Sequence, residues 1–288
     1  MLSLHTNNAA LSAQNALGRT QNSLSTSMTR LSTGYRINSA MDDAAGLQIA
    51  TRLKAQTSGM AVAMRNTQNS TSMLQTAEGA LNEVNNMLVR MKDLATQAAD
   101  QSSSTADKDA MQAEFDNLGK EIANVMTNTK FGGQTLLQGG TLADKMTFQI
   151  GATTGEKMEI DLSASMGTTG SVMTSLSSVS LHFATSGTTT AGTELSSANS
   201  MIDTIATAID NVSTVRSSLG AAANRLDHVY NNLSNISSNT EAATGRIMDV
   251  DFATESAKMT SNQMLMQAGT AMLKQTNSMS SMVMSLLQ

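Results

Sequence analysis

The 288-residue sequence contains no proline, cysteine or tryptophan, and aromatic residues make up only 2% of it. The absence of cysteine excludes disulfides, thiolate metal sites and cysteine nucleophiles. Because proline interrupts helices, its absence favours long, continuous ones. With so few aromatic side chains, a core has to be built from aliphatic residues and the 23 methionines. A thin core of this kind suits packed helices better than a deep globule.

Charge is also scarce at both ends of the chain. All 23 carboxylates lie between Asp42 and Glu255, whereas residues 1–41 carry three arginines and residues 256–288 carry two lysines. Flexible polar tails are one interpretation of these ends. Their apolar periodicity favours another, burial inside an assembly, because charge is rarely buried without a partner.

No secretory signal is visible at the start of the chain, since residues 1–19 lack a basic segment followed by an apolar one. No apolar run approaches 18 residues, so we expect no membrane insertion. If the protein leaves the cell, it does so by another route.

Heptad repeats run through both ends. One series continues from Ala10 at intervals of seven, and two adjacent series lie side by side in the last 37 residues. Two neighbouring series make an apolar face wide enough to contact several helices. We expect the self-association contacts to come from Leu17, Leu24, Leu31, Phe252, Met259, Leu265, Met266, Met272, Leu273, Met279, Leu286 and Leu287.

Three internal segments also show the apolar spacing of helices, at residues 74–98, 111–125 and 202–233. The third keeps its a/d repeat for about five heptads, with one charged interruption at Arg216. Ser104 and Asp107 fit a capping box that opens a helix over residues 105–128.

A different pattern separates these helices. Residues 146–150 and 158–162 alternate apolar and polar side chains around a glycine-containing link, which predicts a β-hairpin near 146–162. Residues 163–197 then contain 18 Ser or Thr, which predicts an exposed, weakly structured loop. The predicted fold is therefore mainly α: a long antiparallel helical bundle or coiled-coil rod with a small hairpin, in which the two termini pair.

Residues 31–46 read LSTGYRINSAMDDAAG. This segment resembles the amino-terminal signature of bacterial flagellins, usually LSSGLRINSAKDDAAG. Residues 252–255, 267–270 and 285–287 resemble parts of the carboxy-terminal signature. The resemblance covers roughly residues 1–140 and 196–288, and Met41 and Tyr35 depart from it, where the family often has Lys and Leu.

The resemblance implies a structural subunit that polymerises into the extracellular flagellar filament for swimming motility, after unfolded export through the flagellar type III apparatus. Its partners would be other copies of the chain, an export chaperone, and the filament-cap and hook-junction proteins. Residues 1–42 with 252–288 would form inner-tube helices, residues 43–162 with 198–251 a helical rod, and residues 163–197 a short outer loop. A hook–filament junction protein, which has similar ends, is the alternative.

Arg90, Leu94 and Glu114 match positions that contact the vertebrate toll-like receptor for flagellin in receptor-activating relatives. A solvated or packing helix face is the other interpretation of these residues. In the predicted loop, O-glycosylation, common on flagellins, competes with a plain solvated surface, with candidates Ser163, Ser165, Ser171, Thr174, Ser175, Ser177 and Ser178.

No enzymatic chemistry is expected. The three histidines, at positions 5, 182 and 228, fall in no metal-ligand spacing, and no catalytic constellation or cofactor motif is present. The net charge of −5, without a basic and aromatic patch, argues against nucleic-acid binding. The sequence therefore predicts a structural protein without catalytic, metal or cofactor sites.

Overall fold

The computed structural model describes residues 7–167, 169–179 and 191–286, and for residues 191–197 and 279–286 it describes the backbone alone. Helices dominate, so the expected mainly α fold is confirmed. The helices are α1 (Asn8–Thr33), α2 (Ala44–Ala98), α3 (Thr105–Asn128), α4 (Ser163–Met166), α5 (Ser171–Val179), α6 (Ala191–Met248) and α7 (Phe252–Leu286). The strands are β1 (Lys130–Phe131), β2 (Gln134–Thr135), β3 (Met146–Gln149) and β4 (Lys157–Ile160).

The chain divides into two compact units. The terminal unit comprises Met1–Thr57 and Ser238–Gln288, and the middle unit comprises Ser58–Ser237. Helices α2 and α6 contribute residues to both units.

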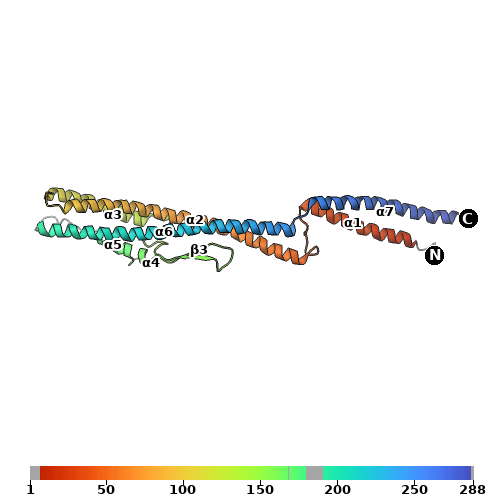
Figure 1. Ribbon diagram of the computed structural model, residues 1–288, viewed down its shortest axis with the longest axis horizontal. Coiled ribbons are helices and arrows are strands. Elements are labelled where there is room, and N and C mark those ends of the chain that lie inside the picture. The colour runs from red at the N-terminus through yellow and green to blue at the C-terminus, as the bar shows by residue number, and fades with distance from the viewer. Residues whose placement is uncertain (1–6, 168, 180–190, 287–288) are drawn as a thin grey trace. The chain divides into compact units, whose positions relative to one another are not determined.

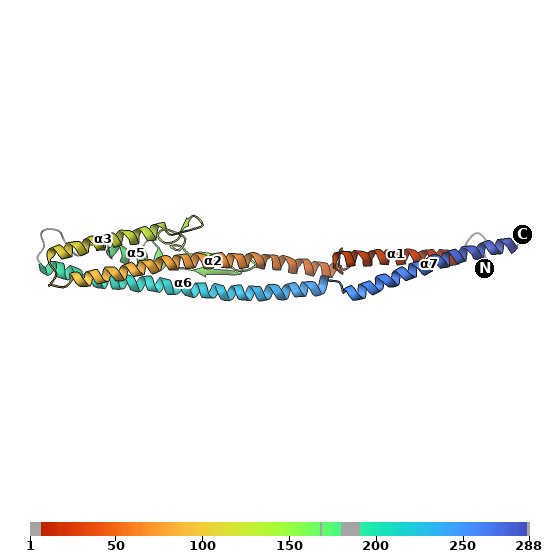
Figure 2. The same ribbon diagram turned by 90° about the horizontal axis from the view of Figure 1, so that it is seen from above.

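In the terminal unit, α1 packs along α7, and the two helices lie side by side in Figures 1 and 2. At one end, the side-chain amide of Asn7 donates a hydrogen bond to the carbonyl oxygen of Thr276 at 3.5 Å. At the other end, Ser27 bonds Glu255. These contacts join the start of α1 to the later part of α7 and its end to the first turn of α7, so the pair is antiparallel.

The heptad positions of this pair differ in burial. Leu24 is buried, and Leu17 and Leu31 are half-buried. On α7, the series Met259, Met266 and Leu273 is half-buried, whereas Leu265 and Met272 of the adjacent series, and Phe252, are exposed. The side chains of Met279 and Leu286, and all of Leu287, lie outside the described parts. One apolar series of α7 therefore lies within the pair, and the other is left uncovered.

The middle unit contains the main hydrophobic core, built along α2, α3 and α6. Figures 1 and 2 show α2 and α6 side by side in this unit. The predicted positions on α2 are all buried, namely Leu74, Ala77, Leu81, Val84, Leu88, Met91, Ala95 and Ala98. Helix α3 adds Phe115, Ile122 and Met126 to the core. The helical periodicity that the sequence shows in these segments is therefore confirmed.

On α6, half of the predicted seam is displaced by one residue. The expected seam combines two series. The first, Ile205, Val212 and Leu219, is buried. In place of the second, Ile202, Ile209 and Arg216, the buried residues are Met201, Ala208 and Val215, one position earlier. Arg216 consequently lies beside the seam, where its guanidinium donates to Glu78 Oε1 on α2 at 2.8 Å. The apparent charged interruption is a salt bridge next to an unbroken apolar seam.

Two local predictions are confirmed in the middle unit. Ser104 and Asp107 form the reciprocal capping box at the start of α3, and β3 pairs with β4 as an antiparallel hairpin from Met146↔Ile160 to Gln149↔Lys157. A second, smaller hairpin joins β1 to β2 and was not expected from the sequence.

The predicted loop over residues 163–197 is wrong for its described parts, because α4 and α5 form there and α6 already begins at Ala191. Val172 and Val179 are buried and Leu176 is partly buried, a spacing of four and three that fits one helix face. Met166 is also fully buried. The Ser and Thr residues obscured this apolar pattern.

Candidate functional site

Exposed large apolar side chains are concentrated in the terminal unit. In the described parts of the chain, the middle unit exposes Val62, Val89 and Ile236. The terminal unit, which is the smaller, exposes Leu11, Met28, Tyr35, Met41, Ile49, Phe252, Met264, Leu265 and Met272. Because grouped exposed apolar side chains mark interaction surfaces, the terminal unit is the candidate functional site.

Part of this surface forms a continuous strip on α7. We call the exposed residues Met264, Leu265, Ala268, Ala271 and Met272 the α7 stripe. Their spacings of three, four and seven place them on one side of a helix. No charged residue occurs between Lys258 and Lys274. The α7 stripe is therefore an uncharged apolar face that α1 does not cover.

A buried polar contact lies at the base of the helix pair. The Ser27 hydroxyl donates to Glu255 Oε1 at 2.6 Å, and both residues are only 4% exposed. Lys258 Nζ lies 3.7 Å from Glu255 Oε2. Glu255 is the single carboxylate in the sequences of α1 and α7. Glu255 is the last acidic residue of the sequence, and no local pattern there indicates that it is buried.

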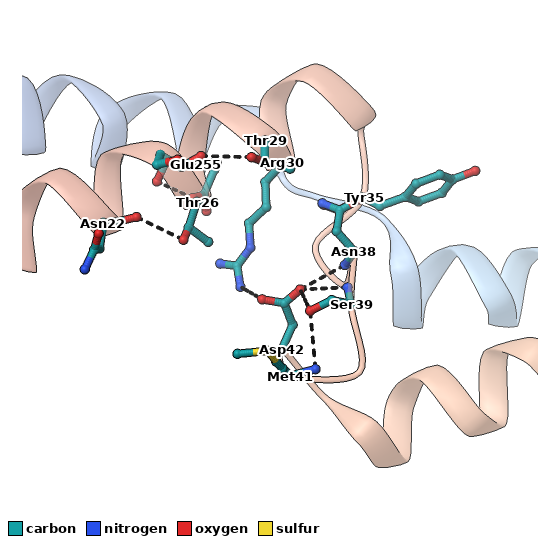
Figure 3. Close-up of polar contacts among 12 residues, drawn as sticks. Asn22, Thr26, Thr29, Arg30, Tyr35, Asn38, Ser39, Met41, Asp42 and Glu255 are labelled. Atoms are coloured by element: carbon teal, nitrogen blue, oxygen red, sulfur yellow. Dashed lines mark hydrogen bonds and ion pairs between the residues drawn. The ribbon is translucent and has the colours of Figure 1, made fainter.

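A shallow polar groove of ≈ 480 Å³ lies over this contact, between α1 and α7. Figure 3 shows Glu255 of α7 with Asn22, Thr26 and Arg30 of α1. The groove is lined by Asn22, Ser23, Thr26, Ser27, Arg30, Glu255, Lys258, Ser261 and Asn262. Its hydroxyl, amide and charged groups contrast with the apolar stripe farther along α7.

The segments that connect the helices are joined to each other beside the pair. Gly34 ends α1 with φ of 76°, and its N–H donates to the carbonyl oxygen of Arg30. The N–H of Val250 donates to the Gly34 carbonyl at 3.0 Å, and Tyr35 and Asp249 form an antiparallel bridge. The Arg36 guanidinium donates to the carbonyl oxygen of Ile247 at 2.8 Å. The α1–α2 and α6–α7 connections are thereby held together.

Asp42 organises the loop between α1 and α2. Its Oδ2 accepts hydrogen bonds from the backbone N–H groups of Asn38, at 3.1 Å, and Ser39, at 2.9 Å, while Arg30 lies 3.7 Å from Oδ1 (Figure 3). The backbone N–H of Ser39, followed by that of Asn38, lowers the pKa of Asp42. Met41 is 96% exposed. Arg30 is the cation that pairs with Asp42.

The end of the 31–46 signature starts α2. Asp43 Oδ1 accepts a hydrogen bond from the N–H of Gly46 at 2.8 Å, as a helix cap does, and Ile37 is buried. A Cβ on Gly46 would lie 2.5 Å from Asp43 Oδ2 and 2.8 Å from Ile37 Cδ1. A side chain at position 46 would therefore require Asp43 or Ile37 to shift, because the cap and the isoleucine occupy the space that its Cβ would take.

Two family models match the stretches of sequence that form the paired terminal helices and the loop between α1 and α2. The bacterial flagellin N-terminal helical region matches residues 4–141, and the bacterial flagellin C-terminal helical region matches residues 202–287. Together they span well over half of the sequence. The chain belongs to the bacterial flagellin family.

Curated relatives in this family include polar flagellin F of Vibrio parahaemolyticus, which is 45% identical over 161 residues. Flagellin C of Vibrio cholerae is 44% identical over the same length. Each match covers 56% of this chain and 42% of the relative, so the chain spans less than half the length of these flagellins.

A solved structure shares the fold. A putative flagellar hook-associated protein from Vibrio parahaemolyticus superposes with a TM-score of 0.60 at 17% identity, over 72% of this chain and 100% of the other. At this identity the likeness shows the fold alone. Within the described residues, no helix combines the length and the apolar character needed to cross a membrane.

The three residues that resemble the flagellin receptor-contact positions meet in the middle unit. Arg90 of α2 donates through Nε to Glu114 Oε1 of α3 at 2.8 Å, and both side chains are about half exposed. Leu94 is only 2% exposed. All three line a depression of ≈ 410 Å³. The polar pair is accessible, whereas Leu94 offers little surface.

The candidate glycosylation residues differ in access. Ser163, Ser171, Thr174 and Ser177 are exposed, and Ser165 and Ser178 are partly exposed. Ser175 is buried, and its hydroxyl donates to the Val172 carbonyl at 2.9 Å. Ser175 is therefore a packing residue of α5 in the folded chain, contrary to its proposed role as an accessible acceptor.

Proposed function

We propose that this chain is the structural subunit of a bacterial flagellar filament, exported unfolded by the flagellar type III apparatus and assembled outside the cell for swimming. Membership of the flagellin family supports the proposal, and the observation that carries it is the uncovered α7 stripe. An apolar face without charge has no favourable place in water, and association with a second copy would bury it.

The assembly would be a helical polymer. A contact between two different faces of identical subunits generates a ring or an open helix, depending on whether the rotation closes. The α7 stripe is one face of such a contact, and its partner lies on another copy. Among the expected residues whose side chains are described, Leu17, Leu24, Leu31, Met259, Met266 and Leu273 are buried or half-buried and would hold α1 to α7. Phe252, Leu265 and Met272 are exposed and would be available to the next subunit.

The proposal assigns each region of the chain a different position in the filament. Residues 1–42 with 252–288 would form the inner tube, residues 43–162 with 198–251 the surrounding helical layer, and residues 163–197 the outer surface. An export chaperone, a filament cap and hook-junction proteins would be the further partners. The match to flagellin models over both terminal regions supports the filament subunit over the junction protein.

Charge placed on the α7 stripe tests the proposal directly. Leu265→Asp and Met272→Asp should abolish or strongly reduce polymerisation, because burying an unpaired carboxylate is unfavourable. Val89→Asp is the matched control, since Val89 is an exposed apolar helix residue of the middle unit. Normal filaments from the Leu265→Asp and Met272→Asp variants, measured by sedimentation and negative-stain microscopy, would contradict the proposal.

Deletion of residues 252–288 gives a coarser test. The middle unit should keep its helical circular dichroism, because its core lies within residues 58–237, while polymerisation should be lost. Long filaments from the intact chain would support the flagellin assignment. Short caps, or no polymer, would instead support the junction protein.

We also propose that the Arg90–Glu114 pair can be recognised by the vertebrate toll-like receptor for flagellin. The supporting observation is that these two side chains, far apart in sequence, meet at an exposed position beside a depression. In a cell reporter assay, Arg90→Ala should lower the response to monomer. Lys120→Ala, which removes an exposed cation of the same unit, is the control and should not.

For O-glycosylation, the accessible hydroxyls of Ser163, Ser171, Thr174 and Ser177 are the proposed acceptors. An intact mass above the sequence mass of 30.2 kDa, with the added mass localised to these residues, would support modification. An intact mass equal to that of the sequence would exclude it for the material tested.

A further inference from the structure

The methionine side chains of the terminal and middle units differ in their exposure to solvent. Among the described side chains, every exposed methionine lies in the terminal unit: Met28, Met41, Met264 and Met272. The buried ones lie in the middle unit: Met60, Met91, Met126, Met158, Met166 and Met201. Oxidation of methionine requires access to sulfur, so the two units should differ sharply in reactivity.

Two of the exposed methionines belong to the α7 stripe. Met264 is 59% exposed and Met272 is 63% exposed, with the exposed Leu265 between them. Met259 and Met266, on the series that faces into the helix pair, are half-buried. Within one helix, then, pairing with α1 separates methionines of high and low access.

We propose that Met264 and Met272 form a peroxide-sensitive modification site whose oxidation blocks assembly of the chain. This inference rests on the proposed filament function, because it takes the α7 stripe as the face that a second copy covers. The stripe carries no charge that would oppose approach of an identical chain, and its apolar area is continuous along α7.

The chemistry requires only a peroxide as co-reactant. A sulfur lone pair attacks one peroxide oxygen, the O–O bond breaks, and an S–O bond forms. The departing oxygen takes the proton of the transferred oxygen and leaves as water. Sulfur loses two electrons and the peroxide gains them, so that a thioether and hydrogen peroxide become a sulfoxide and water.

The product changes the character of the stripe. A sulfoxide is polar and accepts hydrogen bonds, whereas the neighbouring leucine and alanines offer no donor side chain. Burying that oxygen against a second copy therefore costs its hydration. We expect the critical concentration for polymerisation to rise at least about tenfold when both sulfurs are oxidised.

Just as oxidation should hinder assembly, assembly should slow oxidation. A second copy that covers the stripe removes Met264 and Met272 from solvent, so filaments should be oxidised more slowly than free chains at these two positions. Met41, at 96% exposure and outside α7, provides an internal reference for peroxide concentration.

The first measurement is a hydrogen peroxide time course on the free full-length chain, with peptide mass spectrometry for each added oxygen. Met264 and Met272 should react before Met259 and Met266, and the buried methionines of the middle unit should react last. Equal rates for Met264 and Met266 would overturn the assignment, because it depends on α7 being paired with α1.

The second measurement compares the critical concentration before and after peroxide treatment of the same variant. The ratio should be large for the wild-type chain and for Met41→Leu, and close to one for Met264→Leu/Met272→Leu. Sensitivity that persists in the double variant, or disappears in Met41→Leu, would overturn the proposal.

The proposed function and the proposed modification site can be contradicted separately. If the untreated wild-type chain forms no polymer, the proposed function is wrong, although the order of oxidation still tests the exposure argument. If the untreated chain polymerises and its oxidised form polymerises equally well, only the modification site is wrong.

Discussion

The terminal and middle units are both built from long helices, but they differ in how much apolar surface these helices bury. The middle unit buries continuous apolar seams on α2, α3 and α6, and few of its large apolar side chains remain exposed. The terminal unit buries one face of a two-helix pair and exposes another. A chain with almost no aromatic residues can still build a full core, but only where three or more helical faces meet.

The comparison also teaches how stability and function are divided. Among the described side chains of the helix pair, Leu24 is the one buried leucine, so the pair gains little from apolar burial against the entropy of ordering. Its polar links, Ser27–Glu255 and the joined connections at Gly34 and Val250, therefore carry a larger share of its order. The uncovered stripe is what remains available for another chain.

The largest expected effect is in the middle unit. Phe115→Ala should lower the free energy of unfolding by about 3–5 kcal/mol, because Phe115 is 1% exposed and its removal leaves a cavity. Leu24→Ala should cost less than about 2 kcal/mol, since the pair around it is open to solvent. Urea unfolding followed by circular dichroism measures the first and hydrogen exchange in α1 the second. A larger cost at Leu24 would reverse the comparison.

The next effect concerns the buried polar contact. Ser27→Ala should lower the local opening free energy of α1 and α7 by about 1–3 kcal/mol, because Glu255 loses its hydrogen-bond donor while remaining buried. Ser23→Ala is the matched control: Ser23 is exposed on the same helix, and its hydroxyl bonds only the Arg19 carbonyl. Equal hydrogen-exchange protection in the two variants would show that the contact contributes nothing.

Much of the middle unit could be predicted because its seams are repetitive. The 74–98 pattern identifies a buried face in which every expected residue is buried, and Ser104 with Asp107 identifies a helix start by local chemistry. On α6, Ile202 and Met201 are both apolar, so the pattern could not tell which of them faces the seam. Arg216 was the informative residue, because a charge is better placed beside a seam than within it.

The candidate site was predicted less completely, for two physical reasons. Both apolar series of α7 are plausible contacts with α1, and only packing decides which one is covered. The burial of Glu255 depends on Ser27, which is 228 residues away, and no local pattern joins them. Helix α5 was missed because Ser and Thr dominate its composition, although Val172, Leu176 and Val179 share a helix face.

Replacing glycine by alanine should have opposite effects on the stability of α1 at two positions, one within the helix and one at its end. Gly34→Ala should destabilise the α1 terminus by about 1 kcal/mol, since φ of 76° is unfavourable for a residue with Cβ. Gly18→Ala should stabilise α1 by about 0.5–1 kcal/mol, because Gly18 lies within the helix and a Cβ there meets nothing within 4 Å. Hydrogen exchange of the α1 amides should show changes of opposite sign in the opening free energy for the two variants. Changes of the same sign would contradict the assigned end of α1.

The smallest expected effect is the acid sensitivity of the connecting loops. Ser39 and Asn38 N–H groups lower the pKa of Asp42, and the Thr254 hydroxyl and Ala253 N–H lower that of Asp251. Carboxyls with a lowered folded pKa contribute stability that is present above their unfolded pKa of about 3.9 and is lost as pH falls through the folded pKa. Pepsin cleavage of residues 34–43 should therefore increase as pH falls below about 4, and this increase should be smaller in Asp42→Asn, which has no carboxyl to protonate.

Because Asp107 caps α3 in the same way but lies in the middle unit, where a full core holds the helix, cleavage near Ser104 should change less over that range. Equal acid sensitivity at the two sites would show that the core does not protect its caps.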